Sequence, residues 1–136
     1  MTKTQEAVVG IIRREGRVLV IQRGPRARMS GYWSPPTGRI EDDESQAQAV
    51  VREMREELGL KVLPLAKVWE SRTDDGSFLL HWWLVKEDGA QLTLNPDEVS
   101  QVVWVNTEEF LQLGRTFRGG REFFRTVLTS MAEAMG

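Results

Sequence analysis

One amphipathic helix is marked more clearly than any other element in this sequence, and it limits what the chain can fold into. From Ser45 to Leu58, apolar residues recur at helical spacing and form a single stripe, which consists of Ala47, Val50, Val51, Met54 and Leu58. Gly59 predicts a glycine cap at the end of the helix. Either Asp43 or Ser45, each with a glutamine three residues later, fits the pattern of an N-terminal cap. A helix with one apolar face has to pack against another layer, which the rest of the chain must supply.

Runs of β-forming residues on both sides of the helix supply that layer. Residues 7–13 and 17–23 are separated by Arg14, Glu15 and Gly16, which predict a hairpin with a positive φ angle at the glycine. The other predicted elements are strands at residues 62–69, 78–86 and 101–105, a short helix at residues 107–113 capped by Thr107, and a final helix at about residues 121–135. Strands therefore flank one central helix, and this order predicts a mixed α and β fold.

Two loops are expected before the helix. Residues 24–30 are polar and form a surface loop. The segment from Ser34 to Gly38 contains Pro35 and Pro36, which exclude both a helix and a central strand, so it is predicted to be a rigid loop. With 136 residues, of which 40% are hydrophobic, the chain can bury an ordinary core, and we expect one domain over residues 1–136.

Composition excludes several kinds of active site. The chain has no cysteine, which rules out thiol nucleophiles, disulfides and thiolate metal sites. His81 is the only histidine, so a general base is expected to be a carboxylate. The N-terminus lacks a signal-peptide pattern and no apolar run is long enough to span a bilayer, so we expect a cytoplasmic protein without membrane contact. The net charge of -2, and the lack of aromatic residues among the basic residues near the N-terminus, argue against nucleic-acid binding.

Three carboxylates of the central helix are the main candidates for chemistry. Glu53, Glu56 and Glu57 stand at positions i, i+3 and i+4, which places them close together beside the apolar stripe. Like charges at these spacings destabilise a helix by roughly 0.2 to 0.5 kcal/mol per pair, so a counter-charge is expected nearby. Arginines of the same helix could supply part of it. Clustered carboxylate oxygens are also the preferred ligands of Mg²⁺ and Mn²⁺, although most glutamate-rich helices are simply solvated.

A wider pattern around these glutamates resembles a known motif. Gly38 is followed after five residues by Glu44, and after seven more by the run Arg52-Glu53-Met54-Arg55-Glu56-Glu57-Leu58-Gly59-Leu60. This spacing resembles the Nudix box, here residues 38–60, at all of its defined positions. The chain is thereby identified as a member of the Nudix hydrolase family, similar to its MutT-like pyrophosphohydrolases.

The resemblance implies both a fold and an activity. Nudix proteins fold as an α/β/α sandwich around a mixed β-sheet. The implied reaction is metal-dependent hydrolysis of a diphosphate linkage, by attack of water at phosphorus, in a nucleoside di- or triphosphate or a nucleoside diphosphate derivative, oxidised nucleotides included. The implied cofactor is Mg²⁺ or Mn²⁺, and the implied partner is a small anionic nucleotide. A monomer or a homodimer is compatible with the sequence.

The resemblance also assigns roles to single residues. Glu53 and Glu57 match metal ligands, Glu56 matches a ligand or a residue that supports one, and Glu44 matches a supporting carboxylate. Arg52 matches the arginine that orients the neighbouring glutamates. The loop before the helix often contributes a backbone carbonyl to the metal, here at Thr37 or Gly38, where many members carry a Gly-Gly pair. Glu98 resembles, more loosely, a later acidic ligand or base, so the general base is either Glu53 or Glu98.

Candidates for substrate contact lie outside the box. Arg23, at the end of the second predicted strand, and Arg28, in the loop that follows, could hold phosphates, or they could be ordinary surface arginines. Trp82 and Trp83 are adjacent on a predicted strand and must point to opposite faces, so one is expected in the core. Trp83 is the candidate to stack on a base. His81, on the same face, is expected to be a hydrogen-bonded structural residue.

Other functions remain as alternatives at this stage. A Nudix-fold module could bind or sense a nucleotide without cutting it, but such a module has no need of the intact cluster of like charges. ADP-ribose and dinucleoside polyphosphates are alternative substrates, although the short chain favours compact ones. Coenzyme A is discounted because the expected upstream signature is incomplete here.

Overall fold

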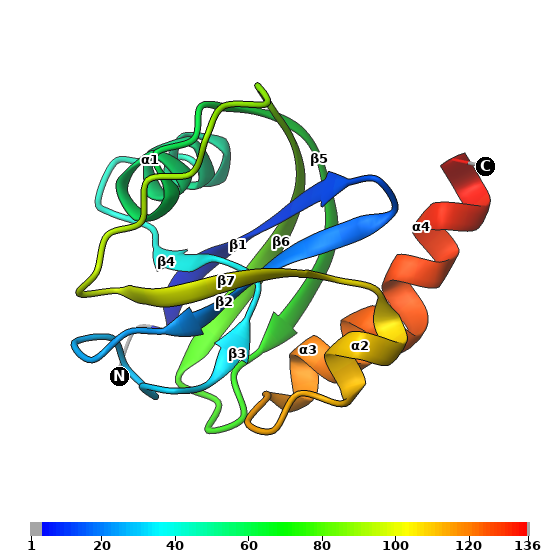
Figure 1. Ribbon diagram of the computed structural model, residues 1–136. Helices are drawn as coiled ribbons and strands as arrows, with labels where there is room; N and C mark the ends of the chain where they lie inside the picture. The colour runs from blue at the N-terminus through cyan, green and yellow to red at the C-terminus, as the bar shows by residue number, and fades with distance from the viewer. Residues whose placement is uncertain (1–3, 136) are drawn as a thin grey trace.

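The computed structural model describes residues 4–135 as a mixed β-sheet with helices on both faces (Figure 1). The strands are β1 (Gln5–Arg14), β2 (Arg17–Arg23), β3 (Trp33–Ser34), β4 (Thr37–Arg39), β5 (Val62–Arg72), β6 (Phe78–Glu87) and β7 (Val99–Val105). The helices are α1 (Gln46–Leu58), α2 (Thr107–Leu111), α3 (Arg118–Glu122) and α4 (Leu128–Met135), with a π-helical segment, η1 (Phe123–Val127), between the last two. The predicted sandwich around a mixed sheet is confirmed.

Strand β1 organises the sheet. The strand order is β3-β2-β1-β6-β5, with β4 also paired to β1 and β7 paired to β2. The pairing of β1 with β6 is parallel, and the other pairings between these strands are antiparallel. The first half of β1 pairs with β4, from Ala7 with Arg39 to Val9 with Thr37, whereas its last residues pair with β2. The residues just before α1 are therefore built into the sheet.

The alternation of side chains along β1 separates two cores. Val8 and Ile12 belong to the core under α1, while Val9 and Ile11 belong to the core under the C-terminal helices. Figure 1 shows α1 on one face of the sheet and α2, α3 and α4 on the other. A Cβ atom at Gly10 would lie 2.8 Å from the sulfur of Met54, so this glycine lets α1 pack closely on the sheet.

Helix α1 is fixed at both ends. Of the two possible caps at its start, the structure has Ser45, whose hydroxyl accepts a hydrogen bond from the backbone of Gln48 at 3.1 Å, while the Gln48 side chain accepts one from Ser45 N at 2.9 Å. Gly59 has a φ angle of 67° and closes the other end, as predicted. The helix that carries the glutamates therefore begins and ends at defined positions.

Several predicted boundaries need correction. Residues 34–38 are not entirely loop, because short edge strands run up to Pro35 from one side and away from Pro36 on the other, and only the prolines themselves lie outside these strands. Helix α2 is capped by Asn106 rather than Thr107, since the Asn106 side chain accepts from Glu109 N at 2.9 Å. The helical C-terminal region begins at Arg118, earlier than predicted, and includes η1.

The hairpin between β1 and β2 forms as predicted. Arg13 pairs with Val18 and Arg14 with Arg17, so the turn consists of two residues. Glu15 and Gly16 both have positive φ angles, 52° and 77°, which suits the right-handed twist of the strands. None of the helices within residues 4–135 is long and apolar enough to cross a membrane.

Candidate active site

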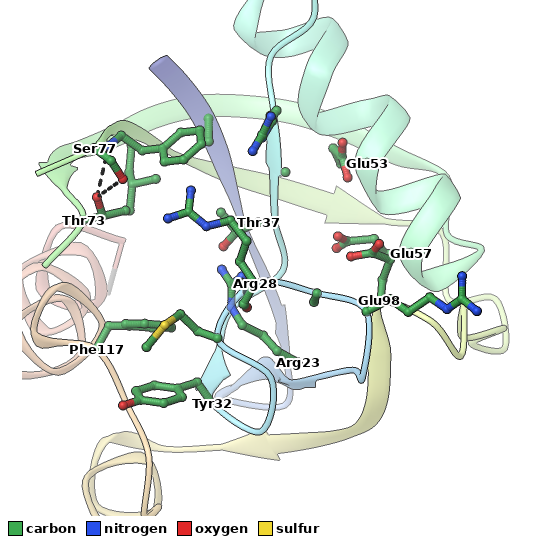
Figure 2. Close-up of a pocket in the computed structure, with 18 of the residues that line it drawn as sticks. Arg23, Arg28, Tyr32, Thr37, Glu53, Glu57, Thr73, Ser77, Glu98 and Phe117 are labelled. Carbon is green, nitrogen blue, oxygen red and sulfur yellow. Dashed lines mark hydrogen bonds between the residues drawn. The ribbon is translucent and has the colours of Figure 1, made fainter. Parts of the chain in front are cut away.

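One cavity of about 680 Å³ brings most of the predicted site residues together. Helix α1 forms one wall, the loop at residues 24–30 a second, and the turn between β5 and β6 a third. Nine predicted residues line this cavity, namely Arg23, Arg28, Thr37, Gly38, Arg52, Glu53, Glu56, Glu57 and Glu98. Figure 2 shows Glu53, Glu57 and Glu98 on one side of it and Arg23 and Arg28 near its centre. Residues as far apart in the sequence as Arg23 and Glu98 thus share one space.

Arg52 connects the carboxylates of the site. Its Nε and Nη2 donate to the two oxygens of Glu44 at 2.7 and 2.9 Å, a bidentate pairing. Its Nη1 donates to Glu53 at 2.8 Å and to Glu56 at 3.2 Å, and its Nη2 also donates to the carbonyl of Arg39 at 2.8 Å. Glu44 raises the pKa of Arg52, and Arg52 in turn lowers the pKa of Glu44. Arg52 therefore supplies the counter-charge that the glutamate cluster requires.

Glu57 is the carboxylate without a cation of its own. Only 6% of its surface is exposed, and its Oε2 is buried without a hydrogen-bond partner. Burial, followed by the charge of Glu53, raises the pKa of Glu57 to about 9, against the opposing effect of Arg23. Burial also raises the pKa of Glu53, although its hydrogen bond to Arg52 opposes this shift. A buried carboxylate in this state is stabilised by any cation that reaches it.

Arg23 is the complementary group on the opposite wall. Burial lowers the pKa of its guanidinium, and its Nε is buried without a hydrogen-bond partner. Its Nη1 donates to the backbone carbonyl of Arg28 at 3.0 Å, and the guanidinium lies 5.3 Å from the centre of the Phe117 ring. Arg23 therefore lines the cavity with a guanidinium whose donors are only partly used, as binding of an anion requires.

Two glycines bring backbone and side chains unusually close at this site. A Cβ atom at Gly38 would overlap the carboxyl group of Glu53, so only glycine lets the loop lie against this side chain. At Gly24, whose N–H donates to the carbonyl of Glu98 at 2.8 Å, a Cβ atom would lie 2.6 Å from the carbonyl oxygen of Asp97. Gly24 thus holds the Glu98 segment beside Arg23, a role that its place in a polar loop did not indicate.

Aromatic side chains line the far end of the cavity. Tyr32 and Phe117 stack with ring centres 4.8 Å apart, and both line the cavity. The guanidinium groups of Arg28 and Arg39 lie 5.2 and 5.3 Å from the centre of the Phe78 ring. Tyr32, Phe78 and Arg39 were not singled out from the sequence, because no local pattern marks a residue that reaches the site through tertiary packing.

Comparison with known proteins identifies the family. Residues 3–127 match the family model described as the NUDIX domain. The chain belongs to the Nudix hydrolase family. It is 38% identical over 112 residues to the CTP pyrophosphohydrolase of Escherichia coli (strain K12). The aligned region covers 81% of this chain and 82% of that protein. It is 32% identical over 114 residues to the 8-oxo-dGTP diphosphatase of the same strain, which covers 79% of this chain and 88% of that protein.

Solved structures agree with this assignment at the level of the fold. The MutT NUDIX hydrolase from Burkholderia pseudomallei superposes with a TM-score of 0.80 over 93% of this chain and 99% of that one, at 22% sequence identity. The protein is thus a Nudix pyrophosphohydrolase, a hydrolase that acts on acid anhydrides, and its family typically depends on a divalent metal.

The residues of this Nudix box suit a divalent cation, although they are not assembled around one. Among residues 4–135, no three acidic or histidine side chains form a ready-made group of metal ligands. Arg52 holds Glu53 and Glu56 by ion pairs. The buried, unpartnered oxygen of Glu57 and the hard oxygen donors around it nevertheless fit Mg²⁺ or Mn²⁺. The Thr37 hydroxyl donates to the carbonyl of Pro35 at 2.9 Å and so is turned toward its own loop.

Two predicted residues do not line the cavity. Glu44 lies behind Arg52 and acts on the site through it, which is compatible with a supporting role. Trp83 packs on the α1 side and donates to Gln46 at 2.9 Å, so the structure does not bring it to the cavity. Trp82 is in the opposite core, as the alternation of a strand requires. His81 has the expected structural role, since its Nε2 lies 2.8 Å from Glu6.

Proposed function

We propose that this Nudix hydrolase cleaves a diphosphate linkage of a nucleoside triphosphate, or of a similarly compact nucleoside phosphate, with Mg²⁺ or Mn²⁺ as cofactor. One observation carries the proposal. The Oε2 of Glu57 and the Nε of Arg23 are both buried without hydrogen-bond partners, and both residues line the same cavity. A cation would neutralise the Glu57 carboxylate, and an anion would accept a hydrogen bond from the Arg23 guanidinium. A metal-bound polyphosphate supplies both charges at once.

The metal site would be built from the Nudix box and the residue before it. Glu53, Glu56 and Glu57 would hold the metal, and the backbone of Thr37 and Gly38 would contribute carbonyl oxygen. When bound, the ion neutralises phosphate oxygens and lowers the pKa of an attacking water. Glu44 acts indirectly, because its bidentate pairing fixes the guanidinium of Arg52, which in turn orients Glu53 and Glu56.

The remaining polar residues divide binding and proton transfer between them. Arg23 and Arg28 bind the phosphates from the wall opposite the glutamates, where their charge also stabilises the anion that develops as the bond breaks. The general base, which takes the proton of the attacking water, is one of two carboxylates. Glu53 has a raised pKa but shares an oxygen with Arg52, whereas Glu98 lines the cavity beside Arg23. Replacing each by glutamine and comparing the pH profiles of kcat separates them.

The nucleoside part of the substrate is supported by two observations. The stacked Tyr32–Phe117 pair offers a flat apolar surface on the side of the cavity away from Glu57 (Figure 2). The relatives include a CTP pyrophosphohydrolase and an 8-oxo-dGTP diphosphatase, both of which act on nucleotides according to their names. The cavity of about 680 Å³ is also within the range of small-molecule sites.

A substrate panel tests the proposal. Nucleoside triphosphates, oxidised triphosphates, ADP-ribose and dinucleoside polyphosphates are incubated with Mg²⁺ or Mn²⁺, and the released phosphate, pyrophosphate and nucleotide are separated. Reaction in ¹⁸O-labelled water shows which phosphorus is attacked. We expect hydrolysis of at least one triphosphate, and loss of nearly all metal-dependent turnover in Glu57→Gln. Tight nucleotide binding without turnover by the wild type would instead favour a non-catalytic sensor.

A further inference from the structure

An ion pair crosses the mouth of the cavity between two walls that are far apart in the sequence. Arg28, in the loop at residues 24–30, places its Nη2 3.5 Å from Oδ2 of Asp75, in the turn between β5 and β6. Both residues line the cavity, and their side chains are 55% and 59% exposed. The pair is therefore accessible to a ligand that enters the cavity, and it involves one of the two arginines proposed to bind phosphate.

Asp75 is held rigidly in this position. Its Oδ1 accepts hydrogen bonds from the hydroxyls of Ser77 at 2.6 Å and Thr73 at 2.8 Å, and from the backbone N–H of Ser77 at 2.9 Å. The bonds from Ser77 and Thr73 lower the pKa of Asp75 to about 2. Asp75 is thus ionised at any pH used for an assay, and only its Oδ2 is left to face Arg28.

Arg28 is directed into the cavity by its other contacts. Its guanidinium lies 5.2 Å from the centre of the Phe78 ring, and its backbone carbonyl accepts from Arg23 at 3.0 Å. Figure 2 shows Arg28 projecting into the space between Glu53 and Glu57 on one side and Thr73 and Ser77 on the other. Arg23 and Arg28 line the same cavity, and the positive charge of Arg28 is close enough to lower the pKa of Arg23.

We propose that Asp75 is a positioning residue that competes with the substrate phosphate for Arg28 and thereby sets the KM. The proposal rests on the proposed function in one respect, that Arg28 binds phosphate. In the free enzyme, Asp75 keeps the guanidinium extended across the mouth over Phe78. When the substrate binds, Arg28 gives up its ion pair with Asp75 to reach the phosphate, and the cost of breaking this pair weakens binding without changing the chemical step.

The competition predicts a separation of KM from kcat. Glu44 or Arg52 substitutions disturb the glutamates, whereas Asp75→Asn removes only the charge that faces Arg28. The amide oxygen of asparagine can still accept from Thr73 and Ser77, so the turn keeps its shape. We expect the KM for the triphosphate substrate to fall about two- to fivefold, the size of effect that one half-exposed ion pair supplies, with kcat unchanged. The decrease shrinks at high ionic strength, because the pair is screened.

A double-mutant cycle shows whether Asp75 acts through Arg28. Arg28→Gln is expected to raise the KM, and adding Asp75→Asn to that variant is expected to change it no further. The matched control is Glu108→Gln, which neutralises an exposed carboxylate of α2 outside the cavity and should leave the KM unchanged. An equal decrease in KM in both backgrounds would show that Asp75 acts by general repulsion, and an unchanged or higher KM in Asp75→Asn would contradict the competition altogether.

A binding measurement separates this inference from the proposed function. Calorimetry with inorganic tripolyphosphate and Mg²⁺ needs neither turnover nor a particular base. The affinity should rise about two- to fivefold in Asp75→Asn and should not change between Arg28→Gln and the double variant. If the wild type hydrolyses no substrate of the panel, the proposed function fails, while the calorimetric cycle still supports or overturns the competition for Arg28.

Discussion

Replacing Glu57 by glutamine is expected to remove a pH dependence of stability from the metal-free protein. Burial raises the pKa of Glu57 from an ordinary value of 4.5 to about 9. When the pKa of a group is higher in the folded protein than in the unfolded chain, its contribution to stability is complete below the unfolded-state pKa. That contribution is lost as the pH rises toward the folded-state pKa. The metal-free wild type should therefore become less stable between about pH 4.5 and pH 9.

The magnitude follows from the proton count. Between about pH 5.5 and pH 7.5, a window that lies inside both pKa values, the folded protein holds one more proton than the unfolded chain. The free energy of unfolding then falls by about 1.4 kcal/mol per pH unit, or about 2.7 kcal/mol across the window. For a chain of this length that corresponds to roughly 10 °C in Tm. Glu57→Gln cannot ionise, so its own contribution to this slope disappears.

Denaturant unfolding with and without a chelator measures the effect. In the chelator, the stability advantage of Glu57→Gln over the wild type should grow by about 2.7 kcal/mol from pH 5.5 to pH 7.5, while the control Glu108→Gln keeps the slope of the wild type. Excess Mg²⁺ should stabilise the wild type at the higher pH and release a proton on binding, and it should stabilise Glu57→Gln much less. A slope that persists in Glu57→Gln, or equal stabilisation of both proteins by Mg²⁺, would refute the assignment of Glu57 as the cation-seeking carboxylate.

Three further substitutions probe how the fold positions the site. Gly38→Ala introduces a Cβ that overlaps the carboxyl of Glu53, so turnover should fall at least tenfold while the far-ultraviolet circular dichroism is retained. Phe124→Ala empties a fully buried ring position stacked 4.1 Å from Phe110, and should lower the free energy of unfolding by about 3 to 5 kcal/mol in a denaturant titration. Ser45→Ala removes the N-cap of α1 and should cost about 1 kcal/mol in the same titration, and Ser45→Asp should restore most of it.

The sequence predicted best where spacing along the chain decides the structure. The stripe and caps of α1 depend on residues three or four positions apart, so the helix and its glutamates could be placed without tertiary information. The same holds for the hairpin at Glu15 and Gly16, where only a turn with positive φ angles at both positions joins the strands. The fold class followed because the box carries a specific motif between β-rich runs.

The predictions that failed or remained incomplete depend on packing between distant segments. Whether Trp82 or Trp83 faces the site cannot be read from their alternation, and in the structure both are in cores, one on each face of the sheet. The pairing of Arg28 with Asp75 joins residues 47 positions apart, and no spacing along the chain links the two. Asn106 lies one residue before the predicted cap, an error of a size that is usual at helix ends.

The ion pairs of the Nudix box show how α1 tolerates glutamates at positions where their charges repel one another. The Arg52 guanidinium is shared among four carboxylates, two of which lie on α1, namely Glu41, Glu44, Glu53 and Glu56. Glu57 is left out of this network, and the nearest compensation comes from Arg23 across the cavity. A direct ion pair between Glu57 and Arg23 would occupy the space that separates these two walls of the cavity. Because both groups stay buried and only partly compensated, the folded chain favours a ligand that is cationic toward α1 and anionic toward β2, which describes a metal-bound polyphosphate.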